Sequence, residues 1–223
     1  LFSLTPGDLE ERREKLIEFF HAGMEARGDL DKGEGKEVTN VFAEESLEQE
    51  IASALKQEGL ASQIGIVFPP VDLAFSKPPK LLVISPRNKI ELIKTILLDP
   101  DIGLKEMENL EETLLIEQDL SALVEDIGGL ATYPSIVPAD AGLLRAAALG
   151  AHEWLHQFWF FHPLGRNYNS SLTMRTLNET AADLAGTELG QVVYNSITGG
   201  ARPVSEGYGY ISEETNDPRT FDF

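Results

Sequence analysis

The chain has 223 residues, of which 42% are hydrophobic and 25% are charged, a balance typical of one folded domain with a substantial core. Its 18 Lys and Arg against 37 Asp and Glu give a formal net charge of −19. This charge argues against nucleic acid or an anionic membrane surface as a partner, because both require a basic surface. The absence of cysteine excludes disulfides and thiolate ligation, so any bound metal must use His and carboxylate groups.

The sequence gives little information about cellular location. It contains no run of about 18 apolar residues, so we expect no transmembrane segment within this chain. The first residue is Leu1 rather than Met, which leaves room for a preceding signal or anchor. The domain would then be soluble, and either extracytoplasmic or tethered to a membrane through a segment outside this chain. The compartment and the oligomeric state stay open.

Residues 1–60 are expected to be mainly helical. Thr5 before Pro6 is typical of an N-cap followed by proline at the first helical position, and the helix should extend to about Ala26. After a charged, glycine-containing loop, a second amphipathic helix is expected over Phe42–Glu58.

Residues 61–135 are expected to form strands with intervening helices. The β-rich composition predicts strands near Gln63–Phe68, Val71–Phe75 and Lys80–Ser85. The stretch NKIELIKTILLDP predicts a helix that stops before Pro100, and ENLEETLLIEQ predicts another. A strand then leads to a break at Gly128-Gly129 and to a short extended piece that ends at Pro134.

Two long helices are expected over residues 140–195. Asp140 is a good N-cap for a helix from Ala141 to about Phe161, and a second helix should cover about Thr173–Asn195 after a polar loop. The tail, residues 196–223, is expected to be irregular. No linker rich in Pro, Gly or Ser divides the sequence, so residues 1–223 are expected to form a single α+β domain.

The first of these long helices contains the pattern H-E-x-x-H, formed by His152, Glu153 and His156. Residues four apart on a helix point to the same side, so the two imidazoles can bind one ion. Glu153 reaches the same side, where it can act as a general base on a water molecule. The pattern therefore predicts a metal site.

Two residues compete to be the third ligand. His162 follows His152 at the spacing of H-E-x-x-H-x-x-G-x-x-H, but Trp159 occupies the position where glycine would break the helix. In a continuous helix His162 would lie about 9 Å further along the axis than His156. A histidine at the end of the helix, favourable beside its negative pole, is the simpler interpretation.

Glu179 is the stronger candidate. NETAAD places Glu179 and Asp183 four residues apart, on one face of the second long helix. A neighbouring antiparallel helix could thus supply a carboxylate ligand, and Asp183 could accept the free N–H of a ligating histidine. An alternative role exists, because Thr176 and Glu179 also fit a capping box, in which Glu179 would only cap its own helix.

With H-E-x-x-H at His152–His156 and N-E-x-x-x-D at Asn178–Asp183, the chain resembles the gluzincin metallopeptidases, the thermolysin-like zinc enzymes. The resemblance covers about Leu143–Tyr194. It implies a zincin-like fold, in which a small twisted mixed sheet packs on two long zinc-binding helices, with additional N-terminal helices. It also implies one Zn²⁺ on His152, His156 and Glu179, with Glu153 as the base and Asp183 behind a ligating histidine. The family commonly has an edge strand before the active-site helix, and the matching residues here are Gly129, Leu130, Ala131, Thr132 and Tyr133.

The resemblance implies hydrolysis of a peptide or protein substrate by zinc and Glu153 acting on a water molecule. The stretch GGLATYP lacks the Gly-x-Met-x-Asn box of the zinc aminopeptidases, which favours an endopeptidase. Another hypothesis is a catalytically silent, zinc-stabilised binding or regulatory domain derived from a peptidase. The residue that would stabilise the oxyanion is not identified by the sequence, and the candidates are Tyr168, Tyr194, Tyr208 and Tyr210.

Overall fold

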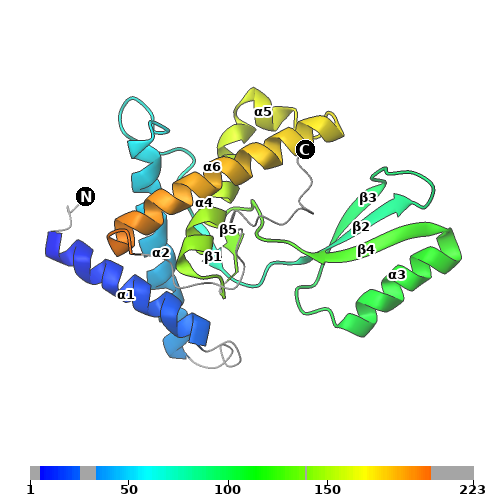
Figure 1. Cartoon of the computed structure of the whole chain (residues 1–223), viewed down its shortest axis with the longest axis horizontal. Helices are drawn as coiled ribbons and strands as arrows, with labels where there is room; N and C mark the ends of the chain where they lie inside the picture. The colour runs from blue at the N-terminus through cyan, green and yellow to red at the C-terminus, as the bar shows by residue number, and fades with distance from the viewer. Residues whose placement is uncertain (1–5, 26–33, 139, 202–223) are drawn as a thin grey trace, which may run out of the picture.

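The fold mixes helices with short strands, as the sequence predicts. A computed structural model of the protein describes residues 6–25, 34–138 and 140–201 (Figure 1). Within these ranges the helices are α1 (Pro6–Glu25), α2 (Glu34–Gln57), α3 (Leu104–Gln118), α4 (Leu143–Phe160), α5 (Pro163–Arg166) and α6 (Leu172–Thr198). The strands are β1 (Leu73–Phe75), β2 (Lys80–Pro86), β3 (Lys94–Leu98), β4 (Leu120–Asp126) and β5 (Ser135–Val137).

The main core lies where α1, α2, α4 and α6 pack together. Leu16 of α1, Ile51 of α2 and Trp154 of α4 are almost completely buried, as is Val193 of α6. Burying such side chains contributes about 1.5–3 kcal/mol each, so this cluster fixes the positions of the two long helices α4 and α6. In the part of the chain that the structure describes, no helix is both long and apolar enough to cross a lipid bilayer.

A two-stranded parallel sheet, β1 with β5, lies beside this core. The other edge of β1 is covered by α2: Glu48 accepts a hydrogen bond from the N–H of Leu73, and Glu44 accepts one from the N–H of Phe75. Four residues of helix rise by about 6 Å and two residues of strand by about 6.6 Å, so the two carboxylates match two successive outward N–H groups. The short strand therefore has hydrogen-bond partners on both edges.

The remaining strands form an antiparallel sheet in the order β3-β2-β4, and α3 packs on one of its faces. Figure 1 shows these four elements projecting from the helical core, and we call them the sheet lobe. Leu82 and Ile84 face α3, whereas Leu81 and Leu97, which pair across the sheet, point into a cleft shared with α4. The prediction of one mixed sheet is therefore wrong, because the parallel and antiparallel pairs belong to two separate sheets.

Two predicted elements between residues 61 and 100 are also wrong. The predicted strand Gln63–Phe68 is a turn, in which Ile66 N–H donates to Ser62 Oγ and Gly65 has a φ of 74°. The predicted helix before Pro100 is instead an irregular segment followed by β3. Its apolar residues give a helical pattern, but pairing with β2 places Leu97 opposite Leu81, and long-range pairing prevails over local propensity.

The other predictions differ mainly at element ends. Helix α2 begins earlier than Phe42, and α4 begins after Gly142 in extended conformation rather than at Asp140. The predicted loop after α4 contains the short helix α5. Thr5, Ala26 and residues 202–223 lie outside the described residues, so the first N-cap and most of the predicted tail are untested.

Candidate metal centre

Glycines of α6 allow it to lie directly against α4. A Cβ at Gly190 would lie 2.6 Å from the Cα of Ala148, and a Cβ at Gly186 would lie 3.0 Å from the Cβ of His152. Gly190 contacts Ala148, and Gly186, four residues earlier on α6, contacts His152, four residues later on α4. The two helices therefore run antiparallel. Glu179 lies seven residues, or about two turns, before Gly186 on α6, and this packing brings it alongside the two histidines.

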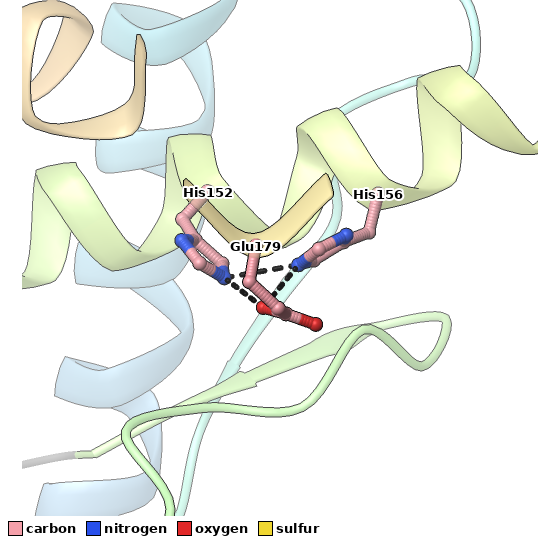
Figure 2. Close-up of side chains that lie close together, drawn as sticks. All are labelled: His152, His156 and Glu179. Carbon is pink, nitrogen blue, oxygen red and sulfur yellow. Dashed lines mark hydrogen bonds and ion pairs between the residues drawn. The ribbon is translucent and has the colours of Figure 1, made fainter. Parts of the chain in front are cut away.

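His152, His156 and Glu179 converge at this helix contact, and Figure 2 shows the three side chains pointing toward one another. The Nε2 atoms of the two imidazoles are 3.0 Å apart. Glu179 Oε2 lies 3.6 Å from Nε2 of His152 and 3.3 Å from Nε2 of His156. The structure therefore brings together the three side chains expected as ligands.

These spacings fit a tetrahedral zinc site. Donors at bond lengths of about 2.0–2.1 Å in tetrahedral geometry lie about 3.3 Å from one another. The three separations, 3.0, 3.3 and 3.6 Å, scatter around this value. Two imidazoles and one carboxylate are also a donor set that zinc accepts, with one position left for water or substrate.

Two further side chains hold the donors in place. Asp183 Oδ1 lies 3.0 Å from Nδ1 of His152, the ring nitrogen that does not face the cluster. The hydroxyl of Tyr168 donates to Oε1 of Glu179, which leaves Oε2 facing the imidazoles. Such contacts orient metal ligands and fix the tautomer of a histidine.

The contacts in the cluster shift the pKa values of Glu179, His152 and Tyr168. The hydrogen bonds from His152 and then His156 hold the pKa of Glu179 well below its usual range. Burial alone would lower the pKa of His152, but its hydrogen bond to Glu179 and the neighbouring carboxylates outweigh burial, and the pKa is raised. Burial, with the hydrogen bond to Glu179, raises the pKa of Tyr168 to about 12. The carboxylate of Glu179 is therefore kept ionised.

Glu153 lies beside the cluster but is not one of its three donors. Its side chain is buried, and a Cβ at Gly129 would lie 2.6 Å from Oε1 of Glu153, so the carboxylate occupies space that a side chain at that position would need. Burial raises the pKa of Glu153 to about 7, against the opposing effect of His152 and His156. Its carboxyl group can thus exchange a proton near neutral pH.

The cluster opens into a cleft of about 1300 Å³, one wall of which is the predicted edge-strand segment Gly129–Tyr133. This segment is not a regular strand, because only Leu130 forms a bridge, with Ile136. It is fastened to α4 by Gln157, whose Nε2 donates to the carbonyl of Thr132 and to Oγ of Ser135. The segment therefore lies along α4 next to the candidate centre.

The alternatives considered from the sequence can now be placed. His162 is exposed at the start of α5, its ring 4.4 Å from that of Phe158, and it is not part of the cluster. The alternative of a capping box at Thr176 and Glu179 is excluded, because α6 is capped earlier, by Ser171. Of the candidate tyrosines, Tyr168 lines the cleft and Tyr194 is in the core. Tyr208 and Tyr210 lie outside the described residues.

Comparisons with known proteins give no further guidance: the chain matches no protein-family model, no curated protein and no solved structure.

Sequence reasoning missed Gln157 and the two packing glycines of α6. Gln157 directly follows the H-E-x-x-H pattern, and its position one turn after Glu153 could have placed it on the same helix face. Gly186 and Gly190 have the spacing that lets helices approach closely, which could have predicted the contact between the two long helices. The contact between Gly129 and Glu153 had no such local signal.

Proposed function

We propose that this chain is a zinc-dependent peptidase, in which His152, His156 and Glu179 hold one zinc ion. The observation that carries the proposal is the convergence of these three donors, at tetrahedral spacing, beside a buried carboxylate that borders a large cleft. The zincin-like fold implied by the sequence motifs is part of the same proposal. A purely structural zinc site would gain nothing from a buried carboxylate that is not a ligand.

Each side chain of the site would have a separate role in hydrolysis. When bound, zinc would polarise a substrate carbonyl and lower the pKa of a water molecule. Glu153 would take the proton from the attacking water and return it to the leaving amine. Asp183 and Tyr168 would hold His152 and Glu179 in position, through the contacts described above.

The cleft favours a polypeptide substrate. Its volume of about 1300 Å³ exceeds the roughly 300–1000 Å³ that small-molecule sites occupy. It extends from Leu81 and Leu97 of the sheet lobe to Phe160 and Phe161 at the end of α4, well beyond the donor cluster. An endopeptidase is therefore favoured over an enzyme that trims single terminal residues.

The decisive variant is Glu153→Gln, which keeps the side-chain shape but removes the base. We expect it to retain about one zinc per chain and to lose peptide hydrolysis by roughly 10²–10⁴-fold. Glu188→Gln, an exposed carboxylate of α6, is the matched control and should keep both properties. Zinc in the wild-type protein, without hydrolysis of any peptide in a broad mixture, would instead favour the silent zinc-stabilised domain.

A further inference from the structure

Three phenylalanine rings are exposed together at the C-terminal end of α4. Phe68, Phe160 and Phe161 are 59%, 69% and 51% exposed. The ring centroids of Phe68 and Phe161 are 5.4 Å apart, and those of Phe160 and Phe161 are 5.3 Å apart. Single exposed apolar residues are ordinary, but a contiguous exposed aromatic cluster indicates a binding surface.

The surrounding backbone holds these rings at the surface. Trp154 Nε1 donates to the carbonyl of Pro69 over 2.8 Å, which fastens the loop that carries Phe68 to α4. Arg166 donates to the carbonyl of Phe161 over 2.9 Å. A Cβ at Gly165 would lie 2.2 Å from the carbonyl oxygen of Trp159, so α5 packs tightly against the end of α4. The aromatic cluster is thus preorganised rather than a frayed helix end.

Phe160 and Phe161 line the same cleft as Glu153, and Phe68 lies against Phe161. Phe160, the last residue of α4, and Phe161, its C-cap, follow Glu153 by seven and eight residues, or about 10–12 Å along the helix axis. Gln157, between them, fastens Thr132 of the neighbouring segment to α4. An extended peptide along this segment advances about 3.3 Å per residue and would cover the distance in just over three residues.

We propose that Phe68, Phe160 and Phe161 form a subsite for a large apolar side chain of an extended peptide, about three residues from the bond that is cleaved. This inference rests on the proposed function, since the register is counted from Glu153. The metal centre is polar, whereas the end of α4 is apolar. The two parts of the cleft would therefore bind different residues of the peptide. Continuity with the cleft argues for a substrate side chain as the occupant, rather than a second copy of this chain.

The test uses the zinc-loaded Glu153→Gln protein, which can bind peptides without cleaving them. The ligands are labelled octapeptides of Ala and Ser, each with one Phe at a different position, and fluorescence anisotropy measures binding. We expect the best-placed Phe to tighten binding roughly tenfold over the peptide without Phe. Adding Phe160→Ser and Phe161→Ser should abolish this gain. Adding Ile116→Ser, which replaces an equally exposed apolar residue of α3, should preserve it.

Cleavage by the otherwise wild-type protein provides the register. Mass spectrometry of the same panel should place the cut about three residues from Phe, a preference that the two Phe→Ser changes remove. Equal binding of the Phe-containing peptides by the Phe→Ser and Ile116→Ser proteins would overturn the inference. A change of oligomeric state in the Phe→Ser protein, with unaltered peptide binding, would overturn it as well. Cleavage without a Phe preference would refute the subsite alone. Phe-dependent binding without any cleavage would refute the proposed peptidase and the three-residue register, while leaving an apolar peptide site.

Discussion

At the scale of single residues, the site depends on a carboxyl group in an unfavourable environment. Glu153 is 6% exposed and lies against the backbone at Gly129, so its charge is poorly solvated. In the metal-free chain its pKa is about 7, whereas the ordinary value is 4.5. Such a group disfavours folding when it is ionised, and this destabilisation would accompany the proposed base beside the donor cluster.

The pH dependence of the free energy of unfolding of the metal-free chain should reveal this destabilisation. Because the folded-state pKa of Glu153 is raised, its contribution to stability is present in full below pH 4.5 and is lost as the pH rises through 7. The metal-free Glu153→Gln protein lacks this ionisation. It should be about 1–3 kcal/mol more stable than the wild type at pH 8 and nearly equal to it at pH 5. Urea unfolding of both proteins in EDTA at pH 5 and pH 8 measures this difference in stability. An equal difference at both pH values would contradict the raised pKa of Glu153.

At the scale of elements, the contact between α4 and α6 determines whether Glu179 reaches the histidines. Gly186 and Gly190 bring the two backbones together, and Ala148 presents a small side chain at the crossing. A larger residue at this contact would push α6 away and draw Glu179 from the cluster. Gly186 and Gly190 therefore help to place Glu179 beside the histidines.

Gly190→Ala tests this contact through the sign of the change in the free energy of unfolding. Alanine is favoured over glycine inside a helix by about 1 kcal/mol, so the change would stabilise an uncrowded helix. Here the new Cβ would lie 2.6 Å from Ala148, and we expect a net loss of about 1–3 kcal/mol together with weaker zinc binding. Thr187→Ala, on the exposed side of the same helix, is the control and should change the free energy of unfolding by less than about 0.5 kcal/mol. Stabilisation by Gly190→Ala would show that the helices are not tightly packed there.

The two long helices were predicted well, because they depend on local spacing, and the structure brings together the three side chains expected as ligands. H-E-x-x-H and the pair Glu179 and Asp183 place their side chains by helical periodicity alone. The prediction of a helix at β3 was wrong. These residues form a strand because they pair with β2, and the local sequence pattern does not indicate this pairing. The aromatic cluster was equally hidden, since Phe68 meets Phe161 from a loop that the composition predicted as a strand.

At the scale of the whole molecule, the proposed zinc would join the two long helices of the core. Its ligands come from α4 and α6, which contribute to the main core together with α1 and α2. The sheet lobe contributes to the cleft but none of the three donors. Metal binding should therefore stabilise the helical core directly.

Removal of the metal should lower the unfolding temperature. At a zinc concentration about 1000 times the dissociation constant, binding stabilises the folded state by roughly 4 kcal/mol. For a chain of this size, that corresponds to roughly 10 °C. Differential scanning calorimetry should show this loss on adding EDTA to the wild type and none for Glu179→Ala. Equal unfolding temperatures of the wild type with and without EDTA would argue against a site that binds zinc in the folded state.

The most direct test of the account is the zinc content per chain of the wild type, Glu179→Ala and His162→Ala, measured by atomic emission after gentle purification. The geometry of the cluster predicts about one zinc per chain in the wild type and in His162→Ala, and loss of zinc in Glu179→Ala. Zinc lost from His162→Ala but kept by Glu179→Ala would contradict the ligand set, and a wild-type protein that binds no zinc would contradict the metal centre itself.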